Sequence, residues 1–234
     1  MSIARKTCRI SVIIPTRNEE AALPATLAAL AQEEVHEVIV ADGGSCDATV
    51  ALARRLGATV VASPAGRGRQ LNAGAAAAGG DVLLFLHADT LPPPGFAAEV
   101  RRLLAAPQVI AGAFRLGITG KDPALRFIAF FANLRAQLGQ LPYGDQGLFL
   151  RATDFYRAGG FRELPLLEDV DLVRRLRRRG KIRLAAGAVC TSARRWQQLG
   201  MLRTTWRNLL VLLGFLLGLS PDRLARWYRR GCLG

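Results

Sequence analysis

The run Val82-Leu83-Leu84-Phe85-Leu86 is the feature that most constrains the fold of this chain. Five consecutive apolar residues predict a strand that is buried on both faces of a sheet. His87-Ala88-Asp89 follows directly, and Pro92-Pro93-Pro94 prevents the strand from continuing. Because open α/β sheets bind their ligands at the carboxyl ends of the strands, Asp89 is a candidate site residue. A lone aspartate at such a position is also typical of a turn or a helix cap.

The residues before this run repeat a strand–helix alternation. Apolar, β-branched runs predict strands over residues 9–14, 37–41 and 59–61. Thr16 and Glu19 fit a capping box, which predicts that a helix begins directly after the first strand. Asp47 is a candidate cap for a second helix that ends at Gly57. This order is typical of a parallel, doubly wound sheet.

The alternation loosens in the second half. Helices are predicted over residues 70–78, 95–105, 123–138, 165–179 and 206–219, and strands over 110–118, 148–150 and 181–185. The helix over 206–219 is strongly apolar and is flanked by arginines, Trp227 and Tyr228. At about 21 Å it is too short to cross a bilayer of roughly 30 Å. It suits either a membrane surface or packing against protein.

The charged residues are distributed unevenly between the two parts of the chain. The net charge is +14, yet residues 1–171 contain 17 Lys/Arg and 17 Asp/Glu, whereas residues 172–234 contain 15 Lys/Arg and a single acid, Asp222. A basic surface of this kind suits anionic lipid, a phosphorylated ligand or nucleic acid. Nucleic acid is not expected as a partner, because no aromatic residues are interleaved along a groove-like basic stretch. The four cysteines have no metal-finger spacing and residues 1–9 have no signal-peptide core, which predicts a cytoplasmic protein.

Four sequence blocks in a fixed order point to one family. They are Ser11-Val12-Ile13-Ile14-Pro15-Thr16-Arg17-Asn18-Glu19, Val40-Ala41-Asp42-Gly43-Gly44-Ser45-Cys46-Asp47, Gly66-Arg67-Gly68-Arg69-Gln70-Leu71-Asn72-Ala73-Gly74 and Leu86-His87-Ala88-Asp89-Thr90. Together with Gly144-Asp145-Gln146-Gly147, Glu168-Asp169 and Arg194-Arg195-Trp196, they resemble the family 2 glycosyltransferases with the GT-A fold. Within that family the chain is similar to the branch called rSAM/selenodomain-associated transferase 2. The resemblance implies a GT-A domain over residues 1–196, followed by a basic, apolar helical extension over 197–234.

The resemblance implies a nucleotide-sugar donor and a divalent metal, Mg²⁺ or Mn²⁺. Asp42 would accept hydrogen bonds from the base or ribose, in a pocket shaped by Pro15 and Glu19. The residues implied to bind the donor are Pro15, Arg17, Glu19, Asp42, Arg69, His87 and Arg195. Asp89 matches the last acid of the family's Asp-x-Asp motif and would hold the metal through carboxylate oxygen. The metal would neutralise the leaving nucleoside diphosphate.

The resemblance also assigns the chemistry of the acceptor side. Asp169, beside Glu168, matches the catalytic base, which takes the acceptor's proton during a direct displacement with inversion. Acceptor contacts are implied for Asp145, Gln146 and Trp196. The expected acceptor is small or lipid-linked. The expected location is cytoplasmic, with peripheral contact between residues 203–230 and the inner membrane face.

Two departures from the family pattern bear on these roles. His87 stands where the first acid of Asp-x-Asp is expected, and histidine is a poor ligand for Mg²⁺. It could instead contact the ribose or be structural. Ser192 replaces the glutamine of the Gln-x-x-Arg-Trp motif of processive synthases, so a single-sugar transfer is expected. Arg194 or Arg195 could bind the diphosphate.

Other interpretations stay open from sequence alone. Asp42, Asp89 and Asp169 also fit turn, cap and helix-dipole roles, and Asp145 fits an ordinary loop acid. A noncatalytic nucleotide-binding or membrane-associated scaffold is an alternative function. A nucleotidyltransferase is a second alternative, although the Gly-rich phosphate loop expected after its first strand is replaced here by Pro15-Thr16-Arg17-Asn18-Glu19.

Overall fold

The computed structural model describes residues 8–120, 122–194 and 200–230. Within these ranges an 8-stranded sheet has the order β3-β2-β1-β4-β7-β6-β8-β5. The strands are β1 (Ile10–Thr16), β2 (Glu37–Asp42), β3 (Thr59–Ala62), β4 (Val82–Phe85), β5 (Thr90–Leu91), β6 (Val109–Ile118), β7 (Leu148–Arg151) and β8 (Lys181–Thr191). The helices are α1 (Leu23–Leu30), α2 (Thr49–Arg55), α3 (Arg67–Ala77), α4 (Phe96–Leu104), α5 (Pro123–Gly139), the 3₁₀ helix η1 (Gly144–Gln146), α6 (Ala152–Arg157), α7 (Glu168–Arg177), α9 (Met201–Leu216) and α10 (Pro221–Arg230).

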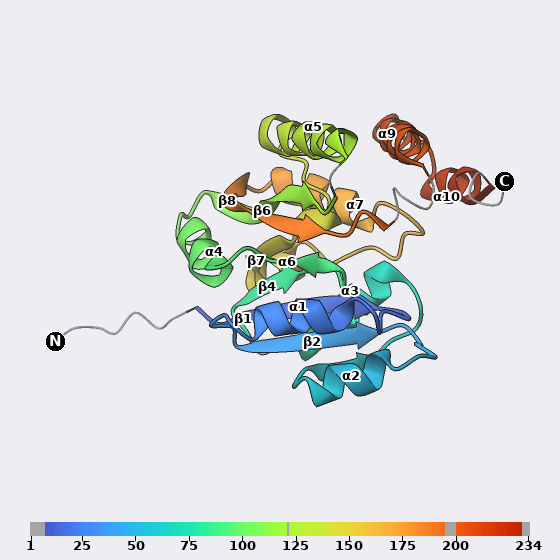
Figure 1. Ribbon diagram of the computed structural model, residues 1–234. Coiled ribbons are helices and arrows are strands. Elements are labelled where there is room, and N and C mark those ends of the chain that lie inside the picture. Colours follow the sequence, from blue (N-terminus) through green and yellow to red (C-terminus); the bar gives the residue numbers. More distant parts are fainter. Residues whose placement is uncertain (1–7, 121, 195–199, 231–234) are drawn as a thin grey trace.

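The first half of the sheet is parallel, as the alternation predicts. β1 pairs in parallel with both β2 and β4, and β2 pairs in parallel with β3 (Figure 1). The second half is mixed: β7 lies antiparallel between β4 and β6, β6 pairs in parallel with β8, and β5 pairs antiparallel with β8. The parallel half therefore brings the carboxyl ends of β1, β2 and β4 to one edge, where a ligand site is expected.

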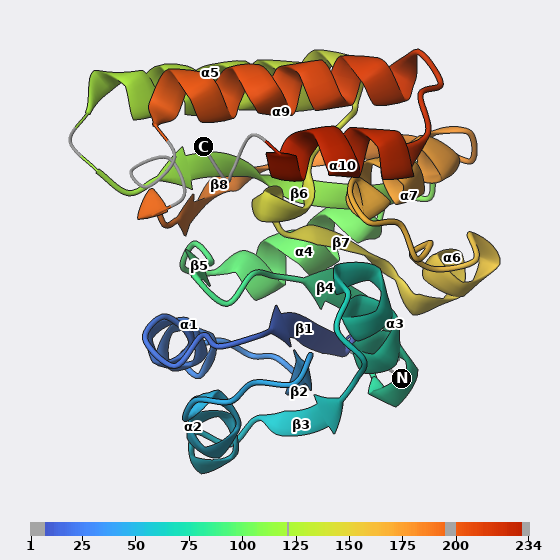
Figure 2. The same ribbon diagram turned by 90° about the vertical axis from the view of Figure 1, so that its right-hand side faces the viewer.

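Both faces of the central strands are buried, which explains their continuous apolar runs. Alternate residues of β4 point to opposite faces, so that Leu84 joins one core cluster and Leu83 and Phe85 join the other. Helices α1, α2 and α4 contribute to the first cluster, and α3, α6, α7, α9 and α10 contribute to the second. Figure 2 shows α1 and α2 on one side of the parallel strands and α3 on the other.

Close packing of α3 on β1 depends on Gly74. A Cβ atom at this position would lie 2.5 Å from Cγ2 of Ile13, which is too close for any side chain. Gln70, on the same face of α3, donates through Nε2 to the carbonyl oxygens of Thr16 at 2.7 Å and Ala41 at 2.9 Å. Helix α3 is thereby fixed to the carboxyl ends of β1 and β2.

The predicted capping box at Thr16 is wrong. Thr16 is the last residue of β1, and its hydroxyl donates to Asp42 instead of capping a helix. Helix α1 begins only at Leu23, and its N-cap, Ala22, makes no side-chain hydrogen bond. The intervening loop is held by a distant segment: Asn18 donates its backbone N–H to the Ser45 hydroxyl at 2.9 Å and accepts from the Cys46 N–H at 2.8 Å.

Three other predicted boundaries shift. Strand β8 extends to Thr191, well past the predicted end at residue 185, because it continues to pair with β6 and then with β5. Helix α7 begins at Glu168, although the predicted helix began at 165. The helix predicted over 206–219 is α9, and the arginine-rich stretch after it forms a separate helix, α10. Gly218, with φ of +87°, lies in the turn between them.

The C-terminal helices pack on the α/β body. Val211, Leu212 and Phe215 of α9 and Leu224 of α10 belong to the same core cluster as Leu83 and Phe85 of the sheet. The boundary predicted between residues 196 and 197 lies outside the described residues and stays a prediction. Among the described helices, none is both long and apolar enough to span a bilayer.

Candidate active site

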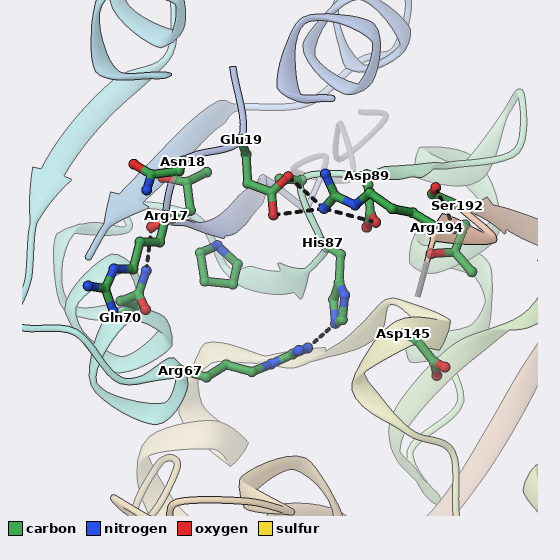
Figure 3. A pocket seen from close by; sticks show the side chains of 14 residues that line it. Arg17, Asn18, Glu19, Arg67, Gln70, His87, Asp89, Asp145, Ser192 and Arg194 are labelled. Carbon is green, nitrogen blue, oxygen red and sulfur yellow. Dashed lines mark hydrogen bonds and ion pairs between the residues drawn. The ribbon is translucent and has the colours of Figure 1, made fainter. Parts of the chain in front are cut away.

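A cavity of about 640 Å³ opens at the carboxyl edge of β1 and β4 (Figure 3). Its lining combines three arginines, three carboxylates and one histidine with smaller polar groups. The charged and histidine lining residues are Arg17, Glu19, Arg67, His87, Asp89, Asp145 and Arg194. Pro15 also lines the cavity. Arginine forks suit phosphate oxygens, and carboxylates suit hard cations and hydroxyl groups.

Two distant parts of the chain meet at the cavity through β5 and β8. Thr90 pairs with Thr191 across these strands, and their hydroxyls are 3.0 Å apart. Ser192 donates its N–H to the carbonyl oxygen of Asp89 at 3.2 Å. On the other side, the Thr26 hydroxyl of α1 donates to the carbonyl oxygen of Ala88 at 2.7 Å. The turn that carries Asp89 is thus fixed from both sides.

Arg194 bridges two carboxylates at the rim of the cavity. Its Nη2 atom lies 3.2 Å and 3.1 Å from the two carboxylate oxygens of Glu19, and 3.9 Å from Oδ2 of Asp89. The three side chains come from the loop after β1, the turn after β4 and the end of β8 (Figure 3). A cation therefore already sits between Glu19 and Asp89 in this structure.

Arg67 connects the opposite side of the cavity to the first turn of α7. Its Nε atom lies 2.9 Å from Oε1 of Glu168, and its Nη2 atom contacts Nε2 of His87. Since a guanidinium only donates hydrogen bonds, Nε2 of His87 is the accepting atom of this contact. Figure 3 shows the imidazole directed toward Arg67 and away from Asp89. Burial raises the pKa of Glu168, Arg67 lowers it in part, and the neighbouring Asp169 raises it again.

Asp169 lines a smaller cleft that shares Pro15, Arg67 and His87 with the main cavity. Its Oδ2 atom accepts from the N–H of Gly144 at 2.5 Å, and Oδ1 accepts from its neighbour Val170 at 2.7 Å. A carboxylate offers about four acceptor positions, so two remain for other donors. A Cβ at Gly144 would lie 2.7 Å from Nη2 of Arg67, so any larger residue there would displace the end of the Arg67 side chain where η1, α3 and α7 meet.

Asp42 organises the loop after β2. Its Oδ2 atom accepts from the N–H groups of Gly44 at 3.0 Å and Ser45 at 2.9 Å, while Oδ1 accepts from the hydroxyls of Ser45 at 2.5 Å and Thr16 at 3.3 Å. Burial of the carboxylate raises the pKa of Asp42, but the hydrogen bonds from these residues together outweigh it and leave the pKa below its usual value. The carboxylate is buried under the loop and does not line the cavity.

Among the described residues, the structure brings most of the sequence-predicted site together, with three exceptions. Asp42 lies beneath the loop, Arg69 forms an exposed ion pair with Glu163 at 2.7 Å, and Gln146 is fully buried. Gln146 donates through Nε2 to the carbonyl oxygen of Phe114 at 3.1 Å, which anchors η1 to β6. Arg195 and Trp196 lie outside the described residues.

Arg67 and Gln70 line the cavity although the sequence analysis did not select them. They are three residues apart at the start of α3, on the helical face that also carries Leu71 and Gly74, whereas Arg69 lies on another face. The spacing of three residues could have identified Arg67 and Gln70 as neighbours on one helical face. The predicted helix began at residue 70, however, and α3 begins three residues earlier, at Arg67.

The fold and the cavity define an α/β protein whose ligand site lies at the carboxyl edge of a parallel half-sheet. The model of the family described as "Glycosyl transferase family 2" matches residues 11–160, more than half of the sequence. The chain therefore belongs to glycosyl transferase family 2.

Curated relatives match a limited part of the chain. It is 39% identical over 92 residues to 4,4'-diaponeurosporenoate glycosyltransferase of Staphylococcus haemolyticus (strain JCSC1435), covering 36% of this chain and 24% of that protein. It is 38% identical over 81 residues to an uncharacterized glycosyltransferase of Mycobacterium tuberculosis (strain ATCC 25618 / H37Rv), covering 34% of this chain and 36% of the relative. The match thus spans about a quarter to a third of these relatives.

Solved structures match more of the chain and share its fold. The mannosyltransferase PcManGT from Pyrobaculum calidifontis, in complex with GDP-Man and Mn²⁺, aligns with a TM-score of 0.64 at 21% identity, over 87% of this chain and 61% of that one. Glucosyl-3-phosphoglycerate synthase from Mycobacterium tuberculosis, in complex with Mn²⁺, uridine diphosphate and glucosyl-3-phosphoglycerate, aligns with a TM-score of 0.61 at 23% identity, over 91% of this chain and 81% of that one. These likenesses establish the GT-A glycosyltransferase fold.

Proposed function

We propose that this protein transfers a single sugar from a nucleotide-diphosphate-sugar donor to an acceptor hydroxyl, with inversion at the anomeric carbon. The observation that carries the proposal is the cavity at the carboxyl edge of β1 and β4, where three arginines face three carboxylates and a further acid, Asp169, lies in the adjoining cleft. This set suits a substrate that combines a diphosphate with a hydroxyl-rich sugar. Membership of the family supports the same reaction class.

The donor half of the cavity is assigned to residues after β1, β2 and β4. Pro15 and Glu19 are assigned to the nucleoside, and Arg17, Arg67 and Arg194, which line the same cavity, are assigned to the phosphates. In this assignment Asp42 does not contact the donor directly. Its carboxylate fixes the loop beside the nucleoside pocket. His87 holds the guanidinium of Arg67 instead of ligating a metal.

Asp89 is the proposed protein ligand of a divalent metal; the described residues contain no group of three or more His, Cys, Asp or Glu side chains placed to hold one, so the donor's phosphates would supply further ligands. Asp89 supplies hard carboxylate oxygen, and the Arg194 guanidinium near Asp89 and Glu19 indicates that a positive charge is favoured there. Mg²⁺ or Mn²⁺ held by Asp89 would act as a Lewis acid that neutralises the leaving nucleoside diphosphate. Mn²⁺ is present in the structures of PcManGT and of glucosyl-3-phosphoglycerate synthase, which supports this choice.

Asp169 is the proposed catalytic base. The two backbone hydrogen bonds orient its carboxylate and leave acceptor positions for an incoming hydroxyl. As the acceptor oxygen forms its bond to the anomeric carbon, Asp169 takes the hydroxyl proton and the bond from that carbon to the diphosphate breaks. Glu168 is buried against Arg67, so its role is to position that arginine.

The acceptor is proposed to be small or lipid-linked, with Asp145 among its contacts at the cavity wall. Peripheral contact of residues 203–230 with an anionic inner membrane face is part of the same proposal. It is supported by the excess of basic residues after residue 171.

A ligand screen by thermal shift tests the donor assignment. UDP-, GDP-, ADP- and dTDP-sugars would each be tested with Mn²⁺, with Mg²⁺ and with EDTA. A donor at 100 times its dissociation constant should stabilise the fold by about 2.7 kcal/mol. Folded protein that responds to none of these nucleotides would contradict the transferase proposal and favour the noncatalytic scaffold.

A further inference from the structure

Helix α5 turns an apolar stripe toward solvent. Its exposed members recur at helical spacing, three, four, seven and eleven residues after the first. They are Phe127, Phe130, Phe131, Leu134 and Leu138. Phe127 is 64% exposed and Leu138 75% exposed, whereas Leu125, Ala129 and Ala136 are buried. The outward side of α5 is therefore as apolar as its inward side.

Helix α9 repeats this arrangement beside α5. Its exposed stripe consists of Trp206, Leu209, Leu210, Leu213, Leu216 and Leu217. Leu217, at the C-cap of α9, is 84% exposed, while Val211, Leu212 and Phe215 are buried. The two helices are in contact and lie side by side at one end of the molecule (Figures 1 and 2). We call the two exposed stripes together the α5–α9 face.

The α5–α9 face gathers exposed apolar side chains on two helices that are in contact. Each of its eleven side chains is more than a third exposed, and three of them are phenylalanines. The largest patch on a typical soluble monomer is about 300–600 Å², and a bigger one marks an interaction surface. Since no described helix can span a bilayer, each helix would have to lie along an apolar partner and not across it.

The charges near the face distinguish between its possible partners. Exposed arginines occur at Arg126 on α5 and at Arg223 and Arg226 on α10, the helix that contacts α9, and the exposed Trp227 follows Arg226 in the chain. Residues 172–234 contain 15 basic residues and one acid. A second copy of this chain would bring these positive charges against one another, whereas anionic lipid headgroups would neutralise them.

We propose that the α5–α9 face is a membrane-docking surface, on which both helices lie in the plane of an anionic bilayer. Phe127, Phe130, Phe131 and the exposed leucines enter the acyl boundary, and the exposed arginines contact lipid phosphate. The docking element predicted from sequence comprised residues 203–230 alone; the structure adds α5, which precedes them by some 70 residues. The inference concerns a surface outside the cavity and does not depend on the donor or the reaction.

Flotation of the whole protein with lipid vesicles tests the proposal. One set of vesicles is pure phosphatidylcholine, and the other contains 30% phosphatidylglycerol by design. A triple variant, Phe130→Ser, Leu138→Ser and Leu217→Ser, replaces three strongly exposed side chains of the face. The matched control is Leu56→Ser, which changes a 45% exposed leucine at the C-cap of the distant helix α2. Because all four side chains are exposed, the variants should fold as the parent does, which circular dichroism and the thermal midpoint would verify.

The parent and Leu56→Ser are expected to bind the anionic vesicles equally. The triple variant should lose roughly 100-fold in partition coefficient, about five-fold for each partly inserted side chain. Arg223→Gln with Arg226→Gln should lose roughly 10-fold on anionic vesicles and change little on neutral ones, since each arginine contributes about five-fold or less at the surface. Arg54→Gln with Arg55→Gln on α2 is the charge-matched control.

Three results would overturn the proposal. The first is a parent protein that does not float with anionic vesicles. The second is binding that the triple variant retains. The third is a dimer, detected by sedimentation velocity, that forms without lipid and dissociates in the triple variant; this result would assign the face to a second copy. Thermal-shift response to nucleotides serves as an independent readout, because it reports on the cavity and should be unchanged in every variant.

Discussion

Replacing Asp42 by alanine tests whether this carboxylate holds the loop after β2. The carboxylate accepts two backbone and two hydroxyl hydrogen bonds from Gly44, Ser45 and Thr16, and it is buried. A role limited to contacting a ligand predicts no change in the stability of the ligand-free protein. A role as organiser of the loop predicts a substantial loss.

The size of the loss follows from the hydrogen bonds. A bond to a charged acceptor contributes about 1.5–3 kcal/mol net, but Gly44 is exposed, so water can replace part of what is lost there. We expect Asp42→Ala to lower the free energy of unfolding by about 3 kcal/mol. For a chain of this size, that corresponds to a fall of roughly 6–12 °C in the thermal midpoint.

The pH dependence gives this prediction a second test. Because the pKa of Asp42 is lowered by folding, the ionised carboxylate stabilises the fold above its unfolded pKa of about 3.9, and this contribution is lost as the pH falls through the lower, folded pKa. Calorimetry without ligand should therefore show a full difference between parent and variant at pH 7 that narrows below about pH 4. Glu163→Ala, at an exposed ion pair, serves as control and should change stability by less than about 0.5 kcal/mol. A midpoint within 2 °C of the parent, as an order-of-magnitude threshold, would refute the structural role of Asp42.

Three further substitutions test the other side of the cavity. Arg67→Ala should weaken binding of the responding nucleotide by roughly 10–100-fold in titration calorimetry, because a charge-assisted contact to phosphate is lost. Arg69→Ala, the control, should change the affinity less than about threefold. Equal effects of the two substitutions would contradict the assignment of Arg67 to the phosphates. Glu168→Gln should become more stable relative to the parent as the pH rises from about 4 to 7. The reason is that burial raises the pKa of Glu168, so that folding disfavours its charged form. A difference in thermal midpoint between variant and parent that does not change with pH would contradict this prediction. Gly144→Ala should reduce donor turnover at least about tenfold while the protein stays folded. The added Cβ would lie 2.7 Å from Nη2 of Arg67 and 3.0 Å from Oδ2 of Asp169, and would displace both groups. Unchanged turnover would show that the close approach of Gly144 to these side chains is not needed.

The parallel half of the fold could be predicted because its information is local. Strand β4 is buried on both faces, so its apolar run is uninterrupted, and the polar triplet His87-Ala88-Asp89 marks its end. The same reasoning located the ends of β1 and β2 to within two residues, since β1 continues through Pro15 to Thr16 and β2 ends at Asp42. Since parallel strands bring their carboxyl ends together, the meeting of Pro15 and Asp89 at one cavity follows from strand ends alone.

The features that could not be predicted from the sequence depend on contacts between segments that are distant in the chain. In the loop after Thr16, Asn18 donates a hydrogen bond to Ser45 and accepts one from Cys46, and these distant contacts replace the local capping pattern. Strand β5 has only two residues and pairs with β8 about a hundred positions away, which no periodicity signals. That pairing is what brings Arg194 to Asp89.

Side-chain direction was the other missing information. Arg67 and Arg69 are equivalent in composition, and only the start of α3 decides which one enters the cavity. Likewise, Gln146 lies in a polar, glycine-flanked loop that suits a ligand contact, yet its amide is satisfied by Phe114 and Tyr143 within the core. Such residues can be separated only when the packing around them is known.

The measurement that tests the proposed site most directly is titration of a nucleoside diphosphate with and without Mn²⁺, in the parent and in Asp89→Asn. If Asp89 holds the metal that bridges to the diphosphate, Mn²⁺ should tighten binding to the parent by at least about tenfold, and this enhancement should fall to nearly one in Asp89→Asn. Glu163→Gln, at an exposed acid outside the cavity lining, should keep the full enhancement. An Asp89→Asn protein that binds as tightly with Mn²⁺ as the parent does would contradict the metal site at Asp89 and the donor-binding role assigned to this edge of the sheet.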